Sequence, residues 1–126
     1  MKITNAEDTA VTVINEQIAA PEHVRMVQRG LERCVTEGLF KKAVNKHVDT
    51  AACGRRLELS DTAYRLELCG YFPVQNPQYT IMVVLEKQGL PASAGGMCGP
   101  LFSRIVDGLF PCIPKNNQLE VAPDTK

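Results

Sequence analysis

The chain has 126 residues, of which 44% are hydrophobic and 22% are charged. These proportions are typical of soluble globular proteins and exclude wholesale disorder, and the length fits one ordinary domain or a piece of a larger one. Fourteen basic and fourteen acidic side chains cancel, so no net charge draws the chain to nucleic acid or to an anionic membrane. The longest apolar run covers residues 81–85, far short of the roughly 20 residues that span a bilayer.

The N-terminal residues and the cysteines indicate a cellular location. The first eight residues are polar and acidic and lack the apolar region of a signal peptide, so the chain as written is expected to be cytoplasmic. An odd number of cysteines without a C-x-x-C pair predicts reduced, half-buried thiols, with no metal site and no cofactor. The five cysteines are Cys34, Cys53, Cys69, Cys98 and Cys112.

The first predicted element is a short strand or extended lead-in, because apolar and polar residues alternate over residues 11–14. A helix is then expected from Pro21, since proline fits the first helical turn and Glu22 favours the positive helix end. Gly38 is expected to end this helix, and the basic segment 39–49 predicts a solvated connection. Apolar residues at helical spacing define one face of the helix: Val24, Val27, Leu31, Cys34 and Val35.

Three strands are predicted next. The first lies within residues 50–60, and the second covers residues 64–72, with Arg65 and Glu67 on one face. The third, residues 79–85, is apolar on both faces and is predicted to be central and covered on both sides. The opposite face of the second strand is apolar: Tyr64, Leu66, Leu68 and Phe72. A turn rich in proline separates the last two strands, which predicts an antiparallel meander.

Small residues between 88 and 100 predict a loop, but this loop lacks the Gly-Lys-Ser/Thr ending of a phosphate-binding loop. Gly99 and Pro100 are expected to open a second helix that runs to Leu109. The predicted fold class is α+β, a three-stranded antiparallel meander packed with two main helices. The predicted divisions are an extended lead-in at 1–20, a partial domain at 21–110 and an extended or disordered tail at 111–126.

An ordered series of short motifs runs through these elements. The strand and turn motifs are Gly70-Tyr71-Phe72-Pro73, Asn76-Pro77-Gln78-Tyr79 and Ile81-Met82-Val83-Val84-Leu85. The later motifs are Ala94-Gly95-Gly96 and Gly99-Pro100-Leu101-Phe102, and the earlier ones are Val13-Ile14-Asn15-Glu16-Gln17-Ile18 and Val35-Thr36-Glu37-Gly38. Between about Ile14 and Leu109, the series resembles the carboxy-terminal part of the transpeptidase domain of class B penicillin-binding proteins.

The resemblance implies acyl-transferases that cross-link peptidoglycan, are acylated by penicillin and work outside the cytoplasmic membrane. Their chemistry uses a Ser-x-x-Lys motif, a Ser-x-Asn motif and a Lys-Thr/Ser-Gly strand, because a serine nucleophile needs an adjacent base. The first two motifs are absent from this sequence. Its serines are Ser60, Ser93 and Ser103, followed two positions later by Thr62, Gly95 and Ile105 and three positions later by Ala63, Gly96 and Val106.

The third motif falls, by the resemblance, on Cys53-Gly54-Arg55, and all three residues differ from it. These residues are the candidate binding position, and no catalytic residue is assigned. Arg55 shares a strand side with Cys53 and would keep a cation that suits a carboxylate; alternatively, it is an exposed strand charge. Cys53 would need a base to act as a nucleophile, and His47 is the nearest candidate in sequence, whereas His23 is expected to face solvent.

The sequence thus predicts a catalytically silent fragment or remnant of a penicillin-binding transpeptidase domain. Such a pseudoenzyme would keep the sheet and bind a peptidoglycan peptide or a protein partner that completes the sheet, or form a homo-oligomer through a sheet edge. One alternative is an unrelated small α+β protein-interaction domain with a capped, monomeric sheet. A third hypothesis is a hydrolase whose missing half is supplied in trans. Nucleic acid is not an expected partner of any of these.

Overall fold

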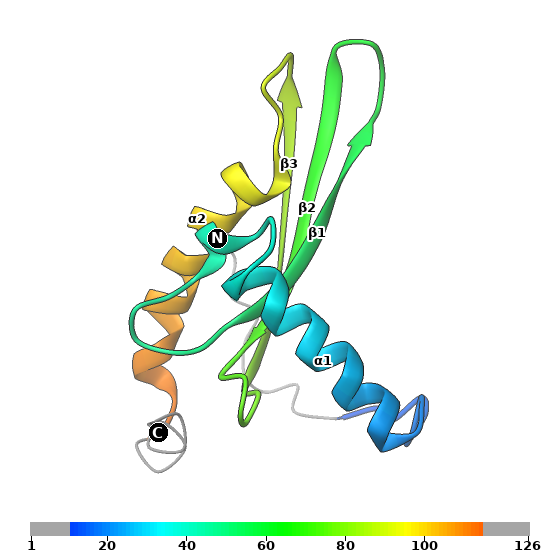
Figure 1. The fold of residues 1–126 in the computed structure, drawn as a ribbon, viewed down its shortest axis with the longest axis vertical. Coiled ribbons are helices and arrows are strands. Elements are labelled where there is room, and N and C mark those ends of the chain that lie inside the picture. The colour runs from blue at the N-terminus through cyan, green and yellow to red at the C-terminus, as the bar shows by residue number, and fades with distance from the viewer. Residues whose placement is uncertain (1–10, 115–126) are drawn as a thin grey trace.

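The computed structural model describes residues 11–114. Its strands form one antiparallel sheet in the order β1-β2-β3, accompanied by two long helices (Figure 1). The elements are α1 (Pro21–Thr36), the 3-10 helix η1 (Lys41–Ala43), β1 (Ala51–Glu58), β2 (Ala63–Phe72), β3 (Tyr79–Gln88), α2 (Ala94–Leu109) and the 3-10 helix η2 (Phe110–Cys112). The predicted α+β meander with two main helices is therefore confirmed.

The central strand of the sheet is β2, which pairs with β1 on one side and with β3 on the other. Its alternation separates a buried inner face from an outer face, as predicted. The inner face carries Leu66, Leu68 and Phe72, all fully buried, and the outer face carries Glu67 and Cys69. The period of two in the sequence thus sets which side of the sheet becomes the core.

The prediction that the third strand is central was wrong. Within residues 11–114, β3 pairs with β2 alone, and its outer side chains Met82 and Val84 are 60% and 48% exposed. Both faces of β3 are apolar, but the described part of the chain covers only the inner one. The second apolar face therefore marks an uncovered surface rather than a central position.

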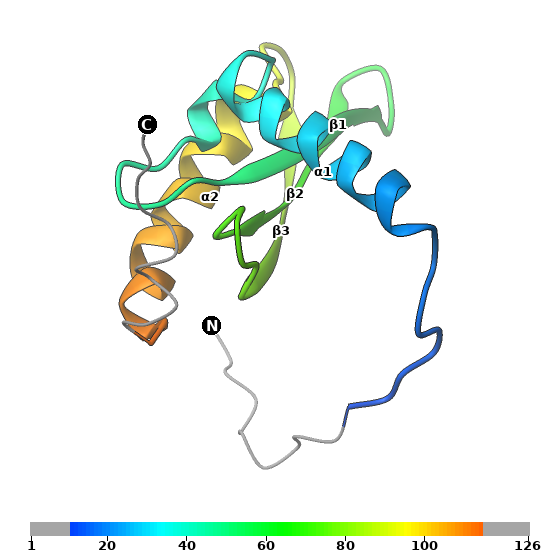
Figure 2. The ribbon, with the colours of Figure 1, turned by 60° about the horizontal axis from the view of Figure 1, so that its bottom comes forward.

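The two helices meet the sheet on different faces. On the inner face, α2 brings Phe102 against the backbone at Gly70. On the outer face, the C-terminal end of α1 brings Cys34 to Cys53 of β1. Figure 2 shows β1 running between α1 and α2, and both helices contact this strand. The start of β1 is consequently covered on both sides, and Ala51 and Ala52 are fully buried.

Only the C-terminal end of α1 is covered by the sheet. The helix begins at Pro21, as predicted, and Gly38 follows its end with a backbone hydrogen bond to Arg33. Of its apolar face only Val35 is fully buried, whereas Val27 is exposed. Figure 1 shows the N-terminal turns of α1 projecting beyond the strands. The amphipathic pattern is therefore real, but its apolar side is only partly covered within residues 11–114: Val24, Leu31 and Cys34 are half-buried.

The second helix begins earlier than the sequence predicted, at Ala94 rather than at Pro100. The Ser93 hydroxyl caps the helix by accepting a hydrogen bond from the Gly96 backbone N–H at 3.0 Å. A Cβ atom at Gly95 would collide with the carbonyl oxygen of Leu39. The small residues therefore allow the first turn to pack closely against the segment before β1, and Pro100 lies inside the helix.

The two ends of the described chain, residues 11–14 and 111–114, adjoin the predicted lead-in and tail. Residues 11–14 form no strand and are exposed. The core continues past residue 110 to Ile113, which is buried. Of the predicted tail at 111–126, residues 115–126 lie outside the described residues, as do the first ten residues of the lead-in. Among the helices of residues 11–114, none is long and apolar enough to cross a membrane.

Candidate functional site

The candidate binding residues Cys53, Gly54 and Arg55 lie side by side near the middle of β1. β1 has β2 as its one neighbour among the described strands. Cys53 stands opposite Cys69 and Arg55 opposite Glu67, all on the outer face, while Gly54 faces inward. The structure thus gathers the cysteine and the arginine on one surface of the sheet, as their spacing predicts.

Gly54 occupies a position with no room for a side chain. A Cβ atom built there would collide with the backbone carbonyl of Glu67 and lie 3.0 Å from the Leu68 Cα. Both obstacles are backbone atoms of the neighbouring strand, which cannot move aside as the tip of a flexible side chain can. The close approach of β1 and β2 therefore requires glycine, and a hydroxyl-bearing residue does not fit this backbone.

The cation of Arg55 is already paired. Its Nε atom donates to Glu67 Oε2 at 2.6 Å, and the two side chains are 66% and 14% exposed respectively. Charge-assisted hydrogen bonds of this length are stronger than neutral ones. Sequence reasoning missed Glu67, although its opposite charge and outward position on the next strand could have suggested the pair. A carboxylate ligand would have to compete with Glu67 for this guanidinium.

The neighbouring Arg56 serves the fold on the opposite face. Its Nη1 atom donates to the Ala92 carbonyl at 3.0 Å, and its guanidinium carbon lies 5.4 Å from the centre of the Tyr64 ring. A shallow groove at this edge of β1 runs between the two arginines and the start of α2. Its lining residues are Leu39, Phe40, Gly54, Arg55, Arg56, Ala92, Ser93, Ala94 and Gly95.

Each serine of the sequence makes structural hydrogen bonds. Ser60 Oγ accepts from the backbone N–H groups of Thr62 and Ala63 in the β1–β2 turn. Ser93 Oγ caps α2, and Ser103 Oγ donates to the Val44 carbonyl at 2.9 Å. These hydroxyls stabilise the β1–β2 turn, the N-terminus of α2 and the contact of α2 with the loop at Val44. None of the three serines is followed three positions later by a lysine.

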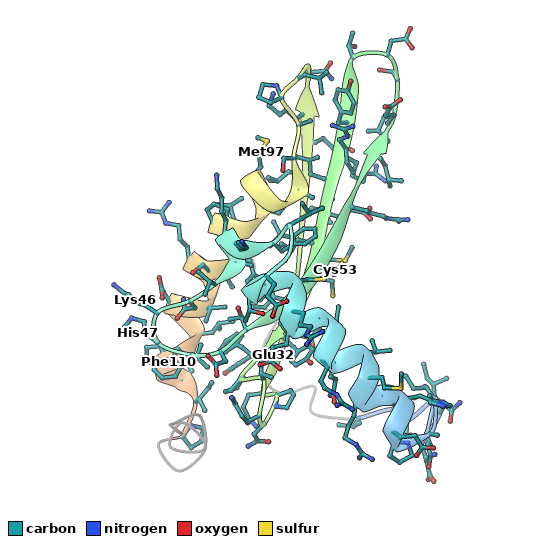
Figure 3. The ribbon with its side chains drawn as sticks, in the orientation of Figure 1. Glu32, Lys46, His47, Cys53, Met97 and Phe110 are labelled. Atoms are coloured by element: carbon teal, nitrogen blue, oxygen red, sulfur yellow. The ribbon has the colours of Figure 1, made fainter. Side chains whose placement is uncertain are left out.

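His47 does not serve as a base for Cys53. Its Nε2 atom lies 4.0 Å from Asp107 Oδ1 on α2, and its ring stacks on Phe110 with centroids 5.9 Å apart. Figure 3 shows His47 and Phe110 together, well away from Cys53. The stacking holds the imidazole at the far end of α2, so His47 does not pair with Cys53.

The group that does meet Cys53 is a second thiol, on Cys34, which sequence reasoning did not connect with it. Burial raises the pKa of the Cys34 thiol, and a side-chain hydrogen bond and charge interaction with Cys53 raise it further. A signal was present, since Cys34 lies on the apolar face of the predicted helix. Over residues 11–114, no group of three or more His, Cys, Asp or Glu side chains is arranged to hold a metal ion.

The fold is similar to known transpeptidase structures. No protein-family model matches the sequence, and a search of curated proteins gives no match. The transpeptidase domain of the FtsI4 D,D-transpeptidase from Legionella pneumophila is 28% identical, with a TM-score of 0.65 over 72% of this chain. The transpeptidase domain of penicillin-binding protein 3 from Burkholderia pseudomallei is 25% identical, with a TM-score of 0.60 over 77% of the chain.

A third structure, a peptidoglycan glycosyltransferase from Burkholderia ambifaria, is 25% identical, with a TM-score of 0.56 over 91% of the chain. This chain spans only part of each of these proteins: 36%, 32% and 35% of their respective lengths. These similarities argue against an unrelated α+β domain. The resemblance inferred from the sequence is confirmed: the chain has the fold of a part of the transpeptidase domain of class B penicillin-binding proteins.

Proposed function

We propose that this chain is a catalytically silent part of a penicillin-binding transpeptidase domain, a pseudoenzyme that retains the sheet scaffold and binds a protein partner. The partner is the remainder of such a domain, either on the same polypeptide or on another. The family role that the resemblance brings to this proposal is peptidoglycan cross-linking and cell-wall biogenesis. In this proposal, the chain contributes strands and helices to the transpeptidase domain, but it does not contribute the nucleophile.

The observation that carries the proposal is the state of the Cys53-Gly54-Arg55 strand. Gly54 has no space for a hydroxyl-bearing side chain, and the Arg55 cation is paired with Glu67. His47, the base weighed for Cys53, stacks on Phe110 instead. These features support the loss of both carboxylate recognition and nucleophilic activation at the strand that resembles the Lys-Thr-Gly position.

The uncovered apolar surface supports the second half of the proposal. Met82 and Val84 are exposed on the outer face of β3, and Val27 is exposed on the projecting part of α1. β3 also has one free edge among the described strands. Exposed edges and apolar faces of this kind promote association. The chain spans 36% of the FtsI4 domain, so a partner supplying the rest has this surface to cover.

Labelling with a fluorescent penicillin, followed by mass measurement of the intact chain, tests catalytic silence. We expect no adduct after prolonged incubation, whereas an active penicillin-binding protein in the same assay is labelled. The Cys53→Ala variant is the matched control, because it lacks the thiol that could be acylated. A mass increase of one penicillin in the wild-type chain that disappears in Cys53→Ala would show that Cys53 is a nucleophile and would overturn the proposal.

The partner surface is tested by light scattering over a range of concentrations. We expect self-association of the chain alone, since no partner covers its apolar surface, and a shift to monomer in Met82→Lys. Val44→Lys is the control, because Val44 is 58% exposed on a loop and Met82 is 60% exposed. A chain that stays monomeric at every concentration, or responds equally to both variants, contradicts the proposed surface.

A peptidoglycan peptide is the competing ligand. Its carboxylate would need the guanidinium of Arg55, which Glu67 occupies. Titration with a peptide ending in D-Ala-D-Ala is therefore expected to give no saturable binding. Saturable binding that is lost in Arg55→Ala would favour a peptide-binding role instead.

The cytoplasmic location stays a prediction, to be tested by fractionating cells that express the full-length protein.

A further inference from the structure

Three sulfur-bearing residues, Cys53, Cys69 and Met82, form a row across the outer face of the sheet. Cys53 of β1 stands opposite Cys69 of β2, and Cys69 stands opposite Met82 of β3. Directly opposed residues of antiparallel strands project from the same face of the sheet. All three residues line one shallow groove. The strand register thus creates a sulfur row from residues that are well separated in the sequence.

The ladder of hydrogen bonds between β1 and β2 determines the spacing of the two thiols. The Leu59 N–H donates to the Ala63 carbonyl at 2.9 Å, one step past the last pair of the ladder. Hydrogen-bonded and non-hydrogen-bonded pairs alternate along antiparallel strands, so Cys53 and Cys69 form a hydrogen-bonded pair. The Cβ atoms of such pairs lie about 5.5 Å apart, whereas a disulfide prefers about 3.8 Å. An ion bonded to both sulfur atoms spans this spacing better than a direct sulfur–sulfur bond.

The thioether of Met82 lies next to Cys69 by the same reasoning. The Gly89 N–H donates to the Thr62 carbonyl at 2.6 Å, one step past the last β2–β3 pair. The alternation makes Cys69 and Met82 a non-hydrogen-bonded pair, in which the Cα atoms lie about 4.5 Å apart and the side chains are closer. Cys69 is exposed and Met82 is 60% exposed. An ion from solvent can therefore reach both sulfur atoms.

We propose that the sulfur row binds one Cu(I) ion through Cys53, Cys69 and Met82. Thiolate and thioether sulfur atoms are soft ligands that suit Cu(I), whereas structural zinc sites take four ligands, one more than the row contains. Both thiols lose their protons on binding, Met82 is a neutral ligand, and the copper stays Cu(I). The sequence predicted no metal site because it lacks closely spaced cysteines. The sulfur row arises from strand register alone.

Met82 also belongs to the apolar surface that we assign to a partner. The metal site does not depend on that assignment, because its ligands all come from this chain. Met82→Leu separates the two proposals, since leucine keeps the apolar character and approximate volume of methionine but has no sulfur. This variant is expected to keep the self-association of the wild-type chain while its Cu(I) binding weakens.

Anaerobic titration of the full chain with Cu(I), in competition with the chelator bicinchoninate, measures affinity and stoichiometry. We expect one tightly bound Cu(I) per chain, with sulfur as its ligand atoms by X-ray absorption spectroscopy. Cys53→Ser and Cys69→Ser should each weaken binding by about 100-fold or more, and Met82→Leu by about tenfold. Even residues that only orient metal ligands contribute about 10- to 100-fold to affinity.

Cys34→Ser and Cys112→Ser are the matched controls. Cys34 is half-buried on α1, and Cys112 is exposed in η2. Both variants should bind Cu(I) as tightly as the wild-type chain. The proposal is overturned if the chain fails to compete with bicinchoninate, if Cys34→Ser weakens binding as much as Cys69→Ser, or if the chain retains zinc more tightly than Cu(I). Stoichiometry and ligand atoms are measured on the wild-type chain, so a poorly folding variant does not decide the result.

Discussion

Arg55 and Glu67 form an ion pair across β1 and β2, from directly opposed positions, with 2.6 Å between Nε and Oε2. The carboxylate is the more deeply placed partner, whereas the guanidinium is mostly exposed. The pair thus holds the cation of the candidate site against the sheet. Its contribution to stability comes mainly from satisfying a partly desolvated carboxylate.

The Arg55→Ala variant is expected to lose about 1 kcal/mol of the free energy of unfolding, because Glu67 then lacks its charged donor. Arg65→Ala is the control, since Arg65 pairs with the more exposed Glu86 at 3.0 Å. That variant should lose less than about 0.5 kcal/mol. Urea denaturation measures both changes, and equal losses would show that the Arg55 pair has no special role.

Gly54→Ala is expected to destabilise the chain by at least about 2 kcal/mol, because the new methyl group meets the backbone of β2. Gly30→Ala on α1 is the matched control. Nothing lies within 4 Å of a Cβ atom at Gly30, so alanine should stabilise the helix by up to about 1 kcal/mol. Thermal unfolding followed by circular dichroism would reveal opposite signs; a neutral Gly54→Ala would contradict the close approach.

Tyr71→Phe is expected to preserve the fold and to raise the free energy of unfolding by about 0.5–1 kcal/mol. The Tyr71 hydroxyl is buried and lacks a hydrogen-bond partner in the structure, so it is desolvated without compensation. Urea unfolding at neutral pH measures the effect. A loss of more than about 1 kcal/mol would mean that this hydroxyl has a partner in solution.

Stability is expected to fall at alkaline pH under reducing conditions. Burial raises the pKa of Cys34 and Cys98 above 9.0, and burial followed by the Glu32 charge raises the pKa of Tyr71 above 10.0. The unfolded chain loses these protons first, so the contribution of each group is complete below its unfolded pKa and is lost as pH rises through the folded value. Unfolding measured from pH 8 to pH 11 should show this decline, with a smaller slope in Cys98→Ala.

Much of the local structure could be predicted from residue patterns. The alternation over residues 64–72 identified the core face of β2, and Pro21 identified the start of α1. The face that a strand residue occupies and the start of a helix both depend on residues that are close in the chain, so the sequence pattern predicts them. The start of α2 was missed because the small residues before Pro100 read as a loop, whereas Gly95 is needed for close packing against Leu39.

The candidate site divides in the same way. The sequence alone shows that it contains neither Ser-x-x-Lys nor Ser-x-Asn. It also shows which residues, Cys53-Gly54-Arg55, stand at the position that resembles the Lys-Thr-Gly motif. The pairing of Arg55 with Glu67, the distance of His47 from Cys53 and the meeting of Cys34 with Cys53 were decided only by the tertiary structure. Each depends on strand register or on helix docking, which bring together residues that no spacing along the chain relates.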